Sequence, residues 1–325
     1  MKRALVLSGG GAKGAFQMGA MEYIQQEQPS YFDFQIVAGI SVGSLNGVMI
    51  AQKKFAELQK IWNTINNDKV YTGQMPTTLV SYVGLITRIL FGQRSILGFD
   101  PLAKMLKENA SLSEISTDYR CGFVSLVTGD YVPCKHSEFG NDDANFRKAI
   151  LASSTMPIIW PPVDEIKIGS IAYKDLVDGG VRNVSPLKDV LVDNPDEMII
   201  INCSTQTTIS DPKAGNTIFR IAKRSLTEIT INEIFREDIE EFIKTNNIVQ
   251  QCQQQGVTVY RDADHTQPYK YFNAIVIEPG NDLGDSLDFS QETVTERRRL
   301  GYEAAKAAFE KYRKATGQRT ARSYK

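Results

Sequence analysis

The stretch FQIVAGISVG, residues 34–43, decides the fold of this chain. Its first part, Phe34 to Ile40, is an apolar run of the kind that forms a buried strand in a parallel sheet. The segment from Val42 to Leu58 has helical character, so Gly39-Ile40-Ser41-Val42-Gly43 lies at a strand-to-helix turn. In that context a Gly-x-Ser-x-Gly motif is typical of a nucleophile elbow, whose small residues Gly39 and Gly43 allow a sharp turn that exposes the serine hydroxyl. Without that context, the pattern fits a glycine-rich helix start with Ser41 as its cap.

Another glycine-rich turn precedes this one, in LVLSGGGAKGAF, residues 5–16. The spacing Gly9-x-Gly11-x-x-Gly14 matches the dinucleotide-binding fingerprint, but the strand at 34–40 does not end in the acidic residue that would bind a ribose. Gly14 is followed by Ala and Phe rather than by Lys and Ser or Thr, which excludes a Walker A loop. Two strand, glycine-turn, helix units in about sixty residues indicate an α/β fold.

The rest of the chain supplies further elements. Apolar runs predict strands at 4–7, 122–126, 198–202 and 272–277, and periodic segments predict helices at 12–28, 79–91, 218–243 and 293–312. The helix at 79–91 is too short to span a bilayer, and we favour a cover over the core or a cleft over a flap that dips into a membrane or micelle surface. The best break in the chain is DPKAGN at 211–216, yet a strand follows it.

Composition and charge exclude several classes of protein. A chain of 325 residues that is 42% hydrophobic and 23% charged is expected to fold around a sizeable core. With a net charge of −1 and a pI near 6.2, no global field attracts nucleic acid, and we expect no nucleic-acid partner. The four cysteines form no Cys-x-x-Cys pair, which argues against a disulfide framework and a zinc knuckle and favours a reducing compartment.

The two ends of the chain bear on its location. The apolar run after Met-Lys-Arg is too short for a signal peptide, so we expect a cytoplasmic protein. Residues 311–325 carry six basic and no acidic side chains, behind the run Arg297 to Arg299. Such a tail suits anionic lipid headgroups, but a solvated, frayed terminus is the favoured interpretation because chain ends are usually loose.

A serine nucleophile requires a base that accepts its proton. The two histidines, His136 and His265, each lie in a polar stretch typical of a surface loop, although His265 comes late enough for a Ser, acid, His order. Asp178 in LVDGGV, residues 176–181, is flanked by apolar residues and followed by two glycines. Partial burial would raise its pKa from about 3.9 toward neutrality and make it a useful base. A tight Asp-Gly turn at the same place is compatible with that role.

The reaction also requires hydrogen-bond donors for the negative charge that develops on the substrate carbonyl oxygen. Gly9, Gly10 and Gly11 follow the first strand and precede a helix, so their backbone N–H groups can point toward that oxygen. Ser41 would emerge at the same edge of the sheet, where ligands of open α/β sheets bind.

Together these motifs resemble the patatin-like phospholipases, serine acyl hydrolases with a Ser-Asp dyad and no catalytic histidine. The matching blocks are GGGAKG at 9–14, GISVG at 39–43, ASSTMPIIWPPV at 152–163, DGGV at 178–181, and Asn183 with Pro186. The ending IEPG...LDFS...GYEAAKAAF is also similar to bacterial members, whereas residues 211–270 match nothing.

The resemblance implies a three-layer α/β/α fold with a mainly parallel central sheet, related to the catalytic domain of cytosolic phospholipase A2. It implies Ser41 as nucleophile, Asp178 as general base and Gly9 to Gly11 as oxyanion hole, with Lys13 and Gly14 in the same loop. The catalytic core would cover about residues 4–205, with 206–325 as a mostly helical extension that packs on the core and completes the same domain.

The resemblance also implies the substrates, namely fatty acyl esters of phospholipids, lysophospholipids or simple lipids, reached by transient contact with a membrane or micelle surface. No cofactor, calcium or other metal is expected, and the metal-like cluster of Asp262, Asp264 and His265 reads as a solvated loop. The alternative is a non-catalytic lipid-binding or regulatory module that retains the fold, against which the intact dyad argues.

Overall fold

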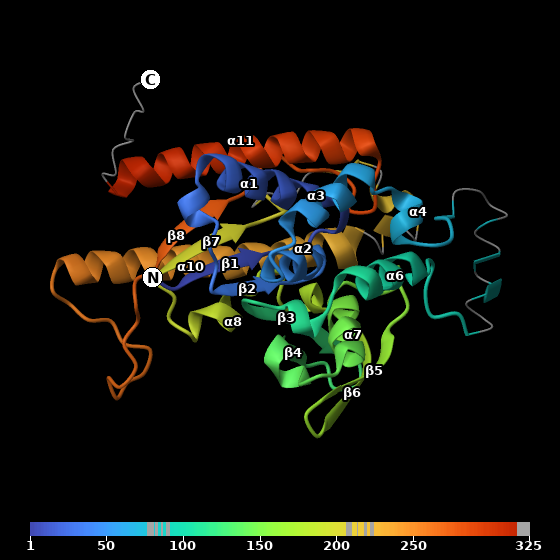
Figure 1. The fold of residues 1–325 in the computed structure, drawn as a ribbon, viewed down its shortest axis with the longest axis horizontal. Helices are drawn as coiled ribbons and strands as arrows, with labels where there is room; N and C mark the ends of the chain where they lie inside the picture. Colours follow the sequence, from blue (N-terminus) through green and yellow to red (C-terminus); the bar gives the residue numbers. More distant parts are fainter. Residues whose placement is uncertain are drawn as a thin grey trace.

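The computed structural model of the chain describes residues 1–76, 81, 84–85, 87–88, 92–205, 210–212, 214–217, 220–221 and 224–316. Within these residues, helices pack on both faces of an eight-stranded, mostly parallel sheet, which makes a three-layer α/β/α fold (Figure 1). The sequence prediction of the fold class is therefore confirmed.

The sheet has a parallel centre and an antiparallel edge. Its strands are β1 (Arg3–Leu7), β2 (Ile36–Gly39), β3 (Asp118–Ser125), β4 (Tyr131–Lys135), β5 (Val163–Ile168), β6 (Ile171–Asp178), β7 (Glu197–Ile201) and β8 (Asn273–Ile277). They follow the order β5-β6-β3-β2-β1-β7-β8, and β4 pairs with β3 outside this path. The five strands from β3 to β8 in this order are parallel to one another, whereas β4, β5 and β6 run antiparallel to their neighbours.

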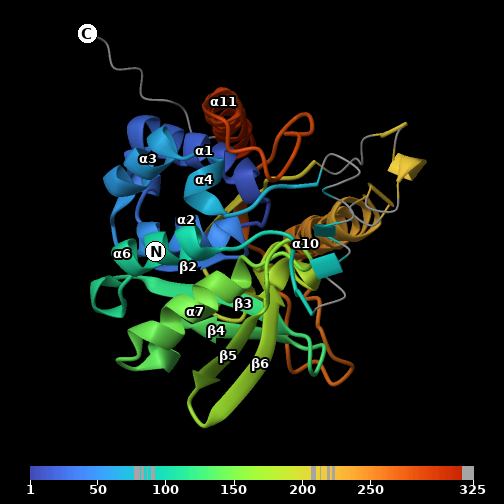
Figure 2. The same ribbon diagram turned by 90° about the vertical axis from the view of Figure 1, so that its right-hand side faces the viewer.

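Side chains alternate between the two faces of β1 and contact two separate cores. Leu5 and Leu7 belong to the larger core, whereas Ala4 and Val6 belong to a smaller core on the other face. The larger core is covered by α1 (Gly14–Glu27), α2 (Val42–Ala51), α3 (Phe55–Thr64), α4 (Asn67–Val70), α6 (Asp100–Asn109), α7 (Asp143–Ser153) and α11 (Gln291–Thr316). The smaller core is covered by α8 (Leu187–Leu191) and α10 (Thr230–Gln254), and Figure 2 shows α10 on the opposite side of the molecule from α1, α2 and α3.

The first and last long helices lie side by side (Figure 1). Their close approach depends on two glycines, because a Cβ at Gly19 would collide with the carbonyl oxygen of Arg298 and a Cβ at Gly301 with that of Phe16. Further along the same contact, the rings of Tyr23 and Tyr302 meet edge to face with 5.2 Å between their centroids. The last described helix thus packs on the helix that follows the first glycine turn.

Most predicted elements are present, and several bounds differ. The strands predicted at 4–7, 34–40, 122–126, 198–202 and 272–277 correspond to β1, β2, β3, β7 and β8, and the helices predicted at 12–28 and 293–312 to α1 and α11. The segment predicted to be helical over 42–58 forms two helices, because the chain breaks between α2 and α3 at Lys53, which has a φ of 57°. The helix predicted at 218–243 begins partly outside the described residues. In the structure a π-helical turn at Arg224–Ile229 leads into α10, which continues to Gln254.

Three predicted features fall wholly or partly outside the described residues, namely the helix at 79–91, the break at 211–216 and the basic tail beyond residue 316. None of the described helices combines the length and the hydrophobicity that a bilayer crossing requires.

Candidate active site

Ser41 lies in a strained turn between β2 and α2. Its φ of 55° and ψ of −129° are a conformation that residues with a Cβ rarely adopt, as the nucleophile-elbow prediction requires. The glycines on either side make the turn sterically feasible, because a Cβ at Gly39 would collide with the Gly43 carbonyl and a Cβ at Gly43 with the Leu7 carbonyl. No side-chain hydrogen bond of Ser41 caps α2, so the alternative role as a helix cap is not supported.

The segment after α7 holds the turn from behind. The Ser41 N–H donates to the carbonyl oxygen of Ser153 at 3.0 Å, and the Ser154 hydroxyl donates to the carbonyl oxygen of Ser41 at 3.1 Å. One residue later, the carbonyl of Thr155 accepts from the N–H of Asp178 at 2.9 Å. These three residues therefore connect Ser41 to Asp178, a role that the sequence block at 152–163 did not reveal.

Asp178 is the last residue of β6 and is only 6% exposed. Its carboxylate is close enough to the Ser41 side chain for the serine to stabilise the ionised form, and its Oδ1 accepts from the Gly180 N–H at 2.7 Å. Burial raises the pKa of Asp178 to about 7, although the Ser41 side chain and the hydrogen bond from the Gly180 N–H both oppose the rise. Near neutral pH this carboxylate therefore exchanges protons readily, as a general base must.

The first glycine turn lies against the same serine. A Cβ at Gly9 would stand 3.2 Å from the Cβ of Ser41, and Gly11 lines the same cavity as Ser41. The Gly9 N–H donates to the Val184 carbonyl at 3.1 Å, so it is occupied within the fold. The N–H groups of Gly10 and Gly11 have no acceptor among the described residues. Of the three glycines predicted to form the oxyanion hole, these two therefore remain as candidate donors.

A loop near the end of the chain supports this glycine turn. The Ser286 carbonyl accepts from the Ala12 N–H at 2.7 Å, and it lies where a Cβ at Gly11 would be. Lys13, predicted as the basic residue of the loop, pairs with Asp282 at 2.9 Å. Buried Arg297 donates to the carbonyls of Leu283, Asp285 and Asp288, and so fixes this loop from α11. Sequence analysis missed these supports because they lie more than 250 residues away, although the run Arg297 to Arg299 was a visible signal.

Gly14 is the first residue of α1, where a Cβ would collide with the side chain of Val42. The two glycine turns predicted from the sequence are therefore in direct contact, and the start of α1 is directed toward the elbow. The positive end of the α1 dipole adds favourable potential for a negative charge in this region.

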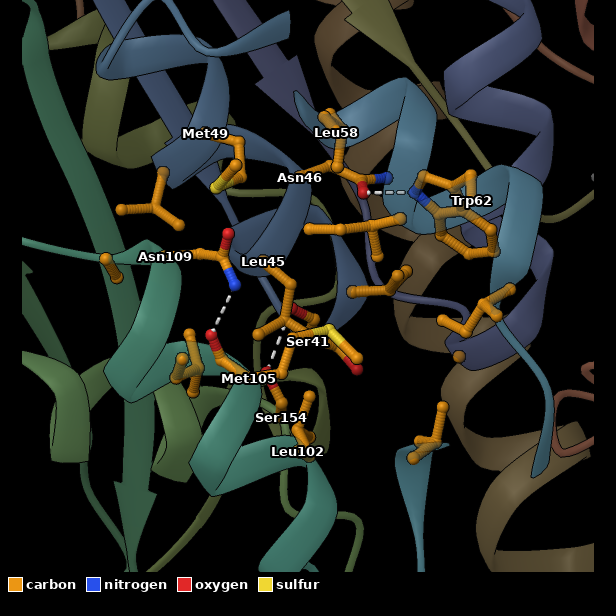
Figure 3. Close-up of a pocket in the computed structure, with 18 of the residues that line it drawn as sticks. Ser41, Leu45, Asn46, Met49, Leu58, Trp62, Leu102, Met105, Asn109 and Ser154 are labelled. Atoms are coloured by element: carbon orange, nitrogen blue, oxygen red, sulfur yellow. Dashed lines mark hydrogen bonds between the residues drawn. The ribbon is translucent and has the colours of Figure 1, made fainter. Parts of the chain in front are cut away.

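A narrow apolar cavity of about 80 Å³ begins at Ser41 and Gly11 and runs along α2. Figure 3 shows Leu45 beside Ser41 and Met49 further along, with Leu58 and Trp62 of α3 on one side and Leu102 and Met105 of α6 on the other. Asn46, a polar residue in the lining, is already hydrogen-bonded to Trp62 and Gln17, so it contributes little polarity. Such a cavity suits a hydrocarbon chain.

Neither histidine lines this cavity. The Nδ1 of His136 accepts from the Tyr119 N–H at 3.2 Å at the start of β3, and His265 stacks on Tyr260 with 4.6 Å between the ring centroids. In the predicted metal-like cluster, Asp262 accepts hydrogen bonds from Thr266 and Gln267. Across the part of the chain that the structure describes, no group of three or more His, Cys, Asp or Glu side chains is arranged to hold a metal ion.

Comparisons with known proteins found a matching family model and similar solved structures. A family model described as patatin-like phospholipase matches residues 5–191. Among solved structures, the crystal structure of VipD from Legionella pneumophila is similar to this chain, with a TM-score of 0.41 and 12% sequence identity over 96% of this chain and 67% of that chain. A search of curated proteins found no match.

Proposed function

Because this chain belongs to the patatin-like phospholipase family, we propose that it is a serine acyl hydrolase that cleaves fatty acyl esters of phospholipids or lysophospholipids. Family membership supports a lipid acyl hydrolase in general. The finer assignment rests on one observation, the placement of the strained Ser41 beside the buried Asp178 at the start of an apolar cavity.

In the acylation half of the reaction, the Ser41 Oγ attacks the acyl carbonyl carbon while its proton passes to the Asp178 carboxylate. The N–H groups of Gly10 and Gly11 donate to the negative oxygen of the tetrahedral intermediate. When the intermediate collapses, the bond to the alcohol oxygen breaks and Asp178 returns the proton to the leaving alcohol. The acyl group is then esterified to Ser41.

In the deacylation half, Asp178 accepts a proton from a water molecule that attacks the acyl carbonyl. The second tetrahedral intermediate uses the same two backbone donors and collapses with the proton returned to the Ser41 Oγ. The products are the fatty acid and the regenerated enzyme. No step in this scheme requires a metal or a cofactor.

The cavity supports the assignment of the acyl group as a hydrocarbon chain. Its lining consists mostly of aliphatic and aromatic side chains, such as Leu45, Met49 and Leu106. Each methylene group that enters such a cavity gains about 0.8 kcal/mol from leaving water. The cavity therefore favours acyl esters over esters of small polar acids.

A fluorophosphonate probe tests the proposal, because it forms a covalent bond with an activated serine. We expect the wild-type chain to be labelled, Ser41→Ala to be unlabelled, and Asp178→Asn to react at least about 100-fold more slowly, since removal of a general base typically costs two to four orders of magnitude. His265→Ala is the matched control and should react like the wild type. A wild-type chain that binds phospholipid vesicles but neither reacts nor hydrolyses esters would instead be a lipid-binding module.

A further inference from the structure

A second cavity, of about 280 Å³, lies on the other face of the sheet from Ser41. It is enclosed by α8, by α10 and by the segment that leads into β8. Its apolar wall includes Leu187 and Leu191 of α8, Phe242 of α10, and Phe272. No residue lines both this cavity and the one at Ser41, so the two are separate sites.

Two buried polar atoms in this second cavity lack hydrogen-bond partners. Ser185 is 1% exposed, and its Oγ has no partner in the described structure. The Oδ2 of Asp238 is also buried and without a partner. Burial raises the pKa of Asp238 to about 6, against the opposing effect of Lys188. An unsatisfied buried polar group typically costs about 1–3 kcal/mol, so a hydrogen-bond donor that reaches these two atoms would stabilise this face of the molecule.

The cavity also offers donors. The guanidinium of Arg261 stacks over the ring of Tyr269 at 5.0 Å, and its N–H groups have no acceptor among the described residues. Lys188 lines the same cavity and is close enough to influence the charge of Asp238. Arginine is well suited to bind a carboxylate or phosphate through two parallel hydrogen bonds. A ligand that pairs with both the acidic and the basic side chains of this cavity therefore has a cationic and an anionic group.

We propose that the second cavity binds a small zwitterion with an ammonium group and an anionic group. The ammonium, which has three N–H donors, faces the oxygen atoms of Ser185, Asp238 and Glu241. The anionic group faces Arg261 and Lys188, and an apolar substituent packs against the wall of Leu191 and Phe242. This chemistry occurs in free amino acids with large apolar side chains and in the phosphoethanolamine headgroup of lipids. The inference is independent of the proposed acyl hydrolase activity.

Isothermal titration calorimetry with the full chain tests this site, using phenylalanine and O-phosphoethanolamine as separate probes. We expect at least one of them to bind, and the responding probe identifies which source the site recognises. If phenylalanine binds, phenethylamine and 3-phenylpropionate, which lack the anionic and the ammonium group respectively, should bind at least about tenfold more weakly, a difference of about 1.4 kcal/mol.

Three variants locate the binding. Asp238→Asn and Arg261→Gln should each weaken binding at least about tenfold, whereas Lys244→Gln is the matched control, since Lys244 lies on α10 outside the cavity and pairs with Glu240. Thermal melting should show that all three fold. Ser41→Ala should bind like the wild type, which separates this inference from the proposed function. The inference is overturned if the wild type binds neither probe at millimolar concentration, or if Asp238→Asn and Arg261→Gln both retain full affinity.

Discussion

Asp178 satisfies two conflicting requirements. A base at the bottom of a lipid-binding site must be shielded from water, yet burial favours the neutral form of a carboxyl group, which cannot accept a proton. The Ser41 side chain and the hydrogen bond from the Gly180 N–H stabilise the ionised form and limit the rise of the pKa to about 7. The residue is therefore partly ionised at neutral pH and is a much stronger base than free aspartate.

This pKa predicts the pH dependence of the reaction. Only ionised Asp178 accepts the Ser41 proton, so kcat/KM for a soluble ester should rise with pH and level off above an apparent pKa of about 7. Initial rates measured between pH 5 and pH 9 give this rise of kcat/KM. Asp178→Asn should lose the rise with pH together with most of the activity. A wild-type profile that is flat across this range would show that another group is the base.

The same shift predicts a change in stability. The pKa of Asp178 is higher in the folded state, about 7, than in the unfolded state, about 3.9, so the folded protein holds the proton more tightly. The contribution of this group is therefore fully present below pH 4 and is lost as the pH rises through 7. Asp178→Asn does not titrate, so relative to the wild type it should gain up to about 4 kcal/mol between pH 4 and pH 8.

Chemical unfolding of both proteins at the two pH values gives this difference. Comparing the change with pH, rather than the stability at one pH, cancels the effect of the amide on local packing. Equal pH dependence in the two proteins would mean that Asp178 is ionised in the folded state well below neutral pH.

At the scale of single residues, sequence analysis identifies groups whose chemistry is local to a motif and misses those whose neighbours come from elsewhere in the chain. Ser41 stands out because glycines lie two residues before and after it, and Asp178 because two glycines follow it directly. The occupied N–H of Gly9 is not visible, because its acceptor, Val184, comes from another segment. Likewise, Cys121 and Cys134 are far apart in sequence, yet the β3–β4 pairing brings their sulfur atoms to 3.4 Å.

Among the elements, α2 both follows Ser41, the proposed nucleophile, and forms one side of the proposed acyl cavity. It begins at the residue after Ser41, and its cavity-lining residues lie at increasing distance from the reacting carbon. With a rise of 1.5 Å per residue, Leu45 lies about 6 Å along the helix from Ser41 and Met49 about 12 Å. We therefore propose that Met49, which lines the cavity farther along α2 (Figure 3), limits the length of the acyl chain.

Met49→Trp should shorten the usable cavity. We expect kcat/KM for a long-chain nitrophenyl ester to fall at least about tenfold, because each methylene excluded from the cavity forfeits about 0.8 kcal/mol. The rate with nitrophenyl butyrate should change about twofold or less, since a short chain ends before Met49. Met49→Leu, which keeps the volume of the side chain, is the control. Equal losses for the long and short esters would place the acyl chain elsewhere.

Sequence analysis predicts the central strands well and the antiparallel edge poorly. β1, β2 and β7 are buried on both faces, so they are apolar runs apart from Arg3 and Glu197 at the first positions of β1 and β7. β5 and β6 form a hairpin with exposed polar side chains, as in DEIKIGSIAYKD at 164–175, which lacks such a run. The end of β6 carries Asp178, so the motif was identified without the strand that positions it.

At the scale of the whole molecule, elements from the first and last parts of the chain pack together near the candidate active site. β8 adds to the sheet beside β7, and α11 packs along α1, which begins directly after the glycine turn. The loop before α11 supports that turn through Ser286 and Arg297. Although the family model ends at residue 191, we propose that the residues beyond it complete the same domain.

The contact between α1 and α11 allows a test of that proposal. Gly301→Ala adds a Cβ that collides with the Phe16 carbonyl, so α11 must move away from α1. Overpacking of this kind typically costs about 1–3 kcal/mol. Because α11 also carries Arg297, displacement of the helix should disturb the loop that supports Gly11 and lower esterase activity as well as the melting temperature.

Gly280→Ala is the matched control for this variant. Gly280 is exposed, and a Cβ there meets no atom within 4 Å, so both activity and melting temperature should stay close to those of the wild type. If Gly301→Ala melts like Gly280→Ala and retains full activity, the C-terminal helix is an accessory that the catalytic fold does not need. If stability and activity fall together, the last helix is a structural part of the site formed at the start of the chain.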